Sequence, residues 1–181
     1  MKRIILAIIL CLLTTSAYCV DLKFLALMKH PVAGGSYTWI NSGDGTYEST
    51  QTQDSTSAAY GGLVVLAGGH TLLQLDVNIT SVGTATQGKI ALYDEYGNNR
   101  LADGGTFTPT TGHNAKTISY VASAGTYLVA IMFNTTDAVV GVDTGSNGRY
   151  VTAANYASFP ELNPGDHGTM TNLNMQVRVG Y

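Results

Sequence analysis

The chain has 181 residues, of which 45% are apolar and only 12% are charged. A chain of this length and composition is not intrinsically disordered, and it can bury a core without metal or disulfide staples. Nine Lys and Arg residues stand against twelve Asp and Glu residues, giving a net charge of −3. The sequence therefore predicts no basic surface for a nucleic acid.

The first nineteen residues have the pattern of a secretory signal peptide. Two basic residues, Lys2 and Arg3, precede the apolar run 4–13, and small residues follow as far as Cys19. A run this short cannot span the roughly 30 Å of hydrocarbon in a bilayer. We therefore expect residues 1–19 to be cleaved, leaving a secreted, extracellular or cell-surface protein without a membrane span.

Two alternatives concern the end of this segment. Cleavage after Ala17 instead of Cys19 also satisfies the preference for small residues. Lipid attachment at Cys19 is disfavoured because Tyr18 stands where a small residue is required. Cleavage after Cys19 removes both cysteines, so the exported protein would depend on its core and not on disulfides.

Residues 20–50 are expected to form an N-terminal arm and a polar loop before the main domain, 51–181. The stretch 41–60 is polar and nearly free of aliphatic residues, which predicts an exposed loop or linker. The arm begins with apolar side chains at every second position, the pattern of a strand with one apolar face. These residues are Val20, Leu22, Phe24, Ala26 and Met28.

The remaining chain alternates between strand-like runs and turns that contain Gly, Asn or Asp. In 71–79 apolar and polar residues alternate, which indicates one buried and one exposed face. Residues 127–133 are apolar on both faces, which predicts a central strand. The pattern favours an all-β, jelly-roll-like β-sandwich of about eight strands with an N-terminal arm. The clearest runs are 62–66, 71–79, 89–93, 117–121, 127–133, 139–142 and 173–179.

Three blocks in the middle of the chain resemble known modules. A Gly-rich turn leads into a strand at 66–77, a Leu-Tyr-Asp-x-x-Gly-Asn hairpin lies in 89–103, and Ala-Gly-Thr-Tyr opens a strand within 118–131. In this order the blocks resemble jelly-roll β-sandwich modules of the bacterial pre-peptidase C-terminal type. They are also similar to sandwiches on phage tail fibres and bacterial surface proteins. The resemblance covers about residues 60–142 and implies a fold and a non-catalytic accessory, binding or appendage role.

The last run carries a signal for assembly, because apolar or aromatic side chains alternate to the end of the chain: Leu173, Met175, Val177, Val179 and Tyr181. Together with the arm residues Leu22, Phe24 and Met28, this pattern suits strand exchange between neighbouring subunits. The alternative is that both termini pair within one molecule. An outer-membrane β-barrel also ends on such a strand, but the other runs are too short for lipid-facing strands.

Aromatic residues in polar segments are the candidate ligand-binding residues. Flat rings stack on sugars, and neighbouring amides and hydroxyls bind the hydroxyl groups of a sugar. Trp39, the only Trp, stands close in sequence to Tyr37 and Tyr47 on a polar stretch. The alternative is that Trp39 packs the arm onto the sandwich.

Catalytic and metal-binding signals are weaker. An apolar strand running into Asp143-Thr-Gly-Ser resembles the active-site loop of aspartic peptidases. Only one such loop is present, so a peptidase would be a homodimer, and the same residues form a good turn. The four histidines are scattered one to a segment, which disfavours zinc. Calcium is the better candidate metal, with Asp94, Asn98 and Asp103 as ligands, and no other cofactor is predicted.

These features predict an exported, non-enzymatic structural or adhesive protein, a subunit of an extracellular appendage, filament or virion-like fibre. The alternative is a carbohydrate-binding accessory module that uses the loop aromatics. An outer-membrane β-barrel and an Asp143-dependent homodimeric peptidase are more remote alternatives. We expect self-association or other surface subunits as partners, with a glycan as the ligand in the alternative and no nucleic acid in any of them.

Overall fold

A computed structural model describes residues 36–152, 155–161 and 167–181. Every strand found in these residues belongs to the compact unit Tyr37–Tyr181. No helix in the described part of the chain is long and apolar enough to cross a membrane. The strands are β1 (Trp39–Asn41), β2 (Ser49–Thr52), β3 (Ala58–Leu66), β4 (His70–Ser81), β5 (Gly88–Asp94), β6 (Arg100–Phe107), β7 (Gly112–Ala122), β8 (Gly125–Phe133), β9 (Val139–Thr144), β10 (Gly148–Thr152), β11 (His167–Met170), β12 (Leu173–Met175) and β13 (Val177–Gly180).

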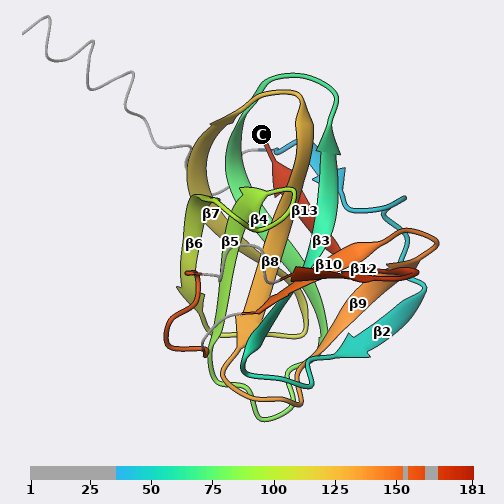
Figure 1. The fold of residues 1–181 in the computed structure, drawn as a ribbon, viewed down its shortest axis with the longest axis vertical. Helices are drawn as coiled ribbons and strands as arrows, with labels where there is room; N and C mark the ends of the chain where they lie inside the picture. Colours follow the sequence, from blue (N-terminus) through green and yellow to red (C-terminus); the bar gives the residue numbers. More distant parts are fainter. Residues whose placement is uncertain (1–35, 153–154, 162–166) are drawn as a thin grey trace, which may run out of the picture. The chain divides into compact units, whose positions relative to one another are not determined.

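The strands form two antiparallel sheets with the main core between them, which confirms the predicted all-β sandwich (Figure 1). The six-stranded sheet has the order β11-β10-β3-β8-β5-β6. The seven-stranded sheet follows β1-β13-β4-β9-β12, with β7 beside β4 and β2 beside β9. The described residues contain thirteen strands, more than the eight expected. The additional strands β1, β2, β6, β10 and β11 are short or rich in Gly and Thr, so their sequences lack a clear alternation.

The core between the sheets is built from alternate residues of the long strands. β4 contributes Leu75, Val77 and Ile79, each of them fully buried. The opposite face of β8 packs in a second apolar cluster with Phe159, outside the sandwich core. The prediction that 127–133 is a central strand covered on both faces is therefore confirmed, since β8 also pairs with β3 and β5.

The C-terminal run, expected to be one continuous strand, is divided at Gln176. β12 pairs with β9, whereas β13 lies between β1 and β4. Met175, Val177 and Val179 are at most 1% exposed, and Leu173 and Tyr181 pack against the same core. In the described residues, this terminus thus pairs within its own molecule and uses its apolar side chains in its own core. The five arm residues named above lie outside the described residues: Val20, Leu22, Phe24, Ala26 and Met28.

The stretch 41–60, expected to be an exposed loop or linker, instead contributes β2 and the beginning of β3. β2 pairs with β9 over its whole length. The buried side chain of Gln53 then binds the end of β8, accepting a hydrogen bond from Phe133 N–H at 2.9 Å and donating to the carbonyl of Phe133 at 3.1 Å. The prediction of a loop was wrong because hydrogen bonds to distant backbone groups hold this segment, although it has few aliphatic residues.

Candidate ligand-binding surface

The outer face of the seven-stranded sheet carries polar side chains from adjacent strands. Leu75 and Val77 of β4 point into the core, so Asp76 between them points to the outer face. In the strand register, Arg178 of β13 lies opposite Asp76 on one side and Ala115 of β7 lies opposite it on the other. The pairing of β13, β4 and β7 therefore brings three distant parts of the sequence onto one surface.

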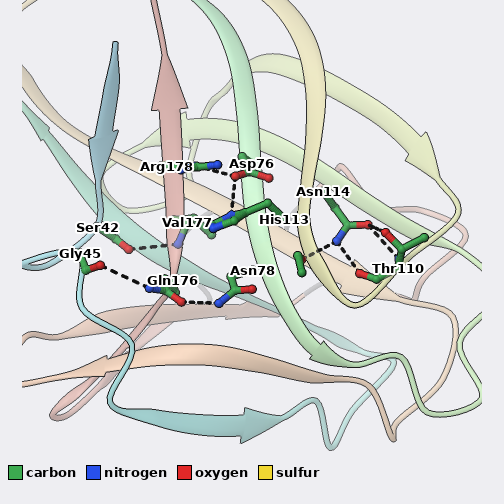
Figure 2. A network of polar contacts seen from close by, with 11 residues as sticks. Ser42, Gly45, Asp76, Asn78, Thr110, His113, Asn114, Gln176, Val177 and Arg178 are labelled. Atoms are coloured by element: carbon green, nitrogen blue, oxygen red, sulfur yellow. Dashed lines mark hydrogen bonds and ion pairs between the residues drawn. The ribbon is translucent and has the colours of Figure 1, made fainter. Parts of the chain in front are cut away.

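Asp76 is a fully buried carboxylate that holds two neighbouring side chains. Its Oδ2 atom accepts a hydrogen bond from Nε of Arg178 at 2.6 Å and lies 2.8 Å from Nδ1 of His113 (Figure 2). Its Oδ1 atom is buried and has no hydrogen-bond partner in the described part of the chain. Because an uncompensated buried charge is costly, these two contacts fix Arg178 and His113 in place.

Trp39 lies against the other side of Arg178. The guanidinium carbon is 4.1 Å from the centroid of the Trp39 ring, and the Tyr37 ring is 5.8 Å from the Trp39 ring in an edge-to-face arrangement. Gly180 pairs with Trp39 in the register, and a Cβ atom there would lie 3.1 Å from Cζ3 of Trp39. Trp39 thus packs on β13, while the residue stays partly exposed.

An amide completes this surface. The Nε2 atom of Gln74 donates hydrogen bonds to Oη of Tyr37 at 3.3 Å and to Oγ1 of Thr117 at 3.2 Å. Aromatic, amide, hydroxyl and charged groups therefore lie together on and beside paired strands. We call this surface the platform, and it consists of Tyr37, Trp39, Gln74, Asp76, His113, Thr117 and Arg178.

Tyr47, the third aromatic residue expected at the ligand site, lies over β9 of the same sheet. Its side chain is 53% exposed, and its ring covers Gly141 of β9, where an added Cβ atom would lie 2.9 Å from Cδ2 of the ring. The same Cβ atom would lie 2.7 Å from Oε1 of Gln176 and 3.1 Å from Nδ2 of Asn78, so Tyr47 lies beside these two amides. Ligand binding by Tyr47 stays a prediction. The sequence prediction did not assign Gln74 and Asp76 to the site, although the alternation in 71–79 places both of them on the polar face.

A groove lies between β1 and β3, with a cavity volume of about 540 Å³. Amides, hydroxyls and one carboxylate line it beside three aliphatic side chains. The lining residues are Ile40, Asn41, Gly43, Leu63, Val65, Glu95, Thr126, Ser146, Asn147 and Asn174.

Asp143 ties two loops together. It is 4% exposed, and its Oδ2 atom accepts a hydrogen bond from the backbone N–H of Asp44 at 2.7 Å. Burial raises the pKa of the Asp143 carboxyl, and the carboxylates of Asp44 and Glu48 add to this effect. Glu48 accepts hydrogen bonds from the hydroxyl and the N–H of Thr144, which lower the pKa of Glu48. Asp143 and Thr144 are the last residues of β9, and these contacts join the end of that strand to the segment 44–48.

The residues named for calcium take part in turn hydrogen bonds. The Asp94 carboxylate accepts from Asn98 N–H at 2.8 Å and from Nδ2 of Asn99 at 2.6 Å. Asp103 accepts from Gly105 N–H at 2.7 Å. No group of three His, Cys, Asp or Glu residues in the described ranges is arranged to hold a metal ion. Calcium binding by Asp94, Asn98 and Asp103 stays a prediction.

A search with protein-family models finds no match, and no curated protein matches the chain. Among solved structures, chitosan-binding module 1 from a chitosanase/glucanase of Paenibacillus sp. IK-5 is similar over 57% of this chain and 89% of that chain, at 14% identity and a TM-score of 0.34. A family 35 carbohydrate binding module from an environmental isolate is similar over 77% of this chain and 95% of that chain, at 14% identity and a TM-score of 0.31. Similarities this distant carry no inference about the ligand. The resemblance of residues 60–142 to pre-peptidase C-terminal and tail-fibre modules is supported only as a β-sandwich fold.

Proposed function

We propose that the protein is a secreted, non-catalytic module that binds neutral polysaccharides on the platform. The observation that carries the proposal is the fixed position of Trp39, a partly exposed residue whose ring rests on Arg178 beside Tyr37. A ring that is already held in place loses little conformational entropy when a ligand stacks on it. The platform is thus preorganised for a flat, partly apolar ligand.

The chemistry of the platform suits a sugar. The apolar C–H face of a pyranose ring stacks on an indole, while amides and hydroxyls at its edge bind the sugar hydroxyls. Gln74 and Thr117 supply these groups next to Tyr37, and His113 is about half exposed on the far side of Asp76. Recognition would therefore combine one stacking interaction with several neutral hydrogen bonds.

The charges on the platform favour a neutral ligand. Asp76 pairs with Arg178 and His113, so the charged groups compensate one another. An anionic polysaccharide would need a cation free to bind it, whereas the Arg178 guanidinium is already engaged by Asp76 and Trp39. We therefore expect binding to neutral glucans, xylans or mannans and none to polygalacturonate.

Affinity electrophoresis in native gels that contain each polysaccharide tests this proposal. The wild-type protein should be retarded by at least one neutral polymer. Trp39→Ala should reduce the affinity by about tenfold or more, because it removes the stacking surface. Gln74→Ala should weaken binding less, since it removes only an amide and leaves the ring in place.

The matched control is Tyr96→Ala, which removes an aromatic ring that is 45% exposed on the turn between β5 and β6. Its retardation should equal that of the wild-type protein. Circular dichroism of each variant verifies that the sandwich is intact. Retardation of the Trp39→Ala variant equal to that of wild type, or wild-type binding to polygalacturonate alone, contradicts the proposal.

A further inference from the structure

One edge of the six-stranded sheet is open next to the groove. Residues 62–66 of β3 pair with β8 on one side, whereas β10 reaches only as far as Gly61 on the other side. Among the described residues, no strand pairs with 62–66 on that second side. Leu63 N–H points there, because it donates to Oδ1 of Asn174 at 2.9 Å. The N–H and carbonyl groups of successive residues point to opposite sides of a strand. Those of Val65 therefore point to the same side as those of Leu63.

Apolar side chains stand at every second position along this edge, as on one face of a strand. Val65 is 66% exposed, and Leu63, two residues before it, is partly buried. Both side chains line the groove, and Ile40 of β1 lines it from the other sheet. An exposed apolar edge with free backbone groups is a template for strand addition, and proteins normally protect such edges.

We propose that this edge accepts residues 20–28 of a second copy of the chain. Apolar residues at every second position of that segment, from Val20 to Met28, match the spacing of Leu63 and Val65. Nine extended residues span about 30 Å, more than the roughly 16 Å of the open edge. Exchange of a terminal segment between identical copies has a small cost in free energy, because each copy donates one segment and accepts an identical one.

Strand addition of this kind links each copy to the next and makes the protein a self-assembling subunit. It is independent of glycan binding, because none of the groove residues used here belongs to the platform. Hydrogen bonds to the backbone of Val65 would supply affinity, and the groove lined by Leu63 and Ile40 would set the register of the added strand.

The test is sedimentation of the mature full-length protein over a range of concentrations. We expect oligomers, and we expect an excess of a synthetic peptide with the sequence of residues 20–30 to dissociate them. Val65→Lys should shift association to roughly tenfold higher concentration, because it puts a charge on the docking edge.

The matched control is Val121→Lys, which places the same charge on another strand valine, 78% exposed. This variant should associate like the wild-type protein. The proposal is wrong if the wild-type protein stays monomeric at every concentration, or if Val65→Lys and Val121→Lys associate equally. Polysaccharide binding by the Val65→Lys variant should be unchanged, which separates a failure here from a failure of the proposed function.

Discussion

The guanidinium carbon of Arg178 lies 4.1 Å from the centroid of the Trp39 ring, although the two residues come from opposite ends of the described domain. Strand pairing of β1 with β13 brings them together, and the absence of a side chain on Gly180 lets the indole lie close to β13. Asp76 holds the other side of Arg178 from β4. One stack of ring, guanidinium and carboxylate therefore joins three adjacent strands.

Loss of Arg178 should destabilise the fold. Arg178→Ala leaves the fully buried Asp76 carboxylate with His113 as its one remaining partner, and we expect the free energy of unfolding to fall by about 2–4 kcal/mol. Urea denaturation monitored by fluorescence measures the change. The control is Arg100→Ala, which breaks a pair with the exposed Glu161 and should cost less than about 1 kcal/mol. Equal losses for the two variants would show that burial of Asp76 has no energetic role.

Ser42 should stabilise the point at which the C-terminal run divides. It is fully buried, and its hydroxyl donates to the Met175 carbonyl at 2.6 Å. The same hydroxyl accepts a hydrogen bond from Val177 N–H at 3.1 Å (Figure 2). Ser42→Ala leaves both groups without that partner, so we expect a loss of about 1–3 kcal/mol. Hydrogen exchange at Val177 N–H should accelerate in the same variant. Ser119→Ala, at an exposed position of β7, should leave both measurements unchanged.

Gly62 should be intolerant of a side chain, because the two sheets approach closely there. A Cβ atom at this position would lie 2.3 Å from the backbone oxygen of Met175 and 2.6 Å from Cγ2 of Val177. We expect Gly62→Ala to lower the free energy of unfolding by about 1–3 kcal/mol. Gly68→Ala is the control, since nothing lies within 4 Å of a Cβ atom there, and it should change stability by less than about 0.5 kcal/mol. A stable Gly62→Ala variant would contradict the close approach.

Asp143 and Glu48 should shift the pH dependence of stability in opposite directions. The folded-state pKa of Asp143 is raised above its ordinary value of 3.8, so its contribution to stability falls as pH rises from that value to the folded-state pKa. Asp143→Asn removes this penalty, and its melting temperature relative to wild type should be higher at pH 7 than at pH 3. A relative melting temperature that does not change with pH contradicts the raised pKa.

The matched variant is Glu48→Gln. The folded-state pKa of Glu48 is lowered from 4.5, so this carboxylate stabilises the fold above that pH, and its contribution disappears as pH falls through the lowered value. Glu48→Gln should therefore melt below wild type at pH 7 and close to it at pH 3. Thermal scans of both variants at the two pH values give the comparison.

The class of the fold could be predicted because it depends on local patterns. Alternation in 71–79 and the continuous apolar run 127–133 each match a strand in the structure, β4 and β8. The short strands could not be predicted in this way. β2, with the sequence Ser-Thr-Gln-Thr, has no apolar pattern and exists because β9 supplies its backbone partners.

The candidate site likewise contains residues whose proximity the sequence predicts and residues that only the tertiary structure brings together. Tyr37 and Trp39 are two residues apart, so in an extended chain they share a face, and their proximity follows from the sequence alone. The recruitment of Arg178, Asp76 and His113 follows from tertiary structure. It depends on the order of β1, β13, β4 and β7 in one sheet. Strand order is set by long-range pairing and core burial, and these are properties of the folded chain that no local stretch of sequence encodes.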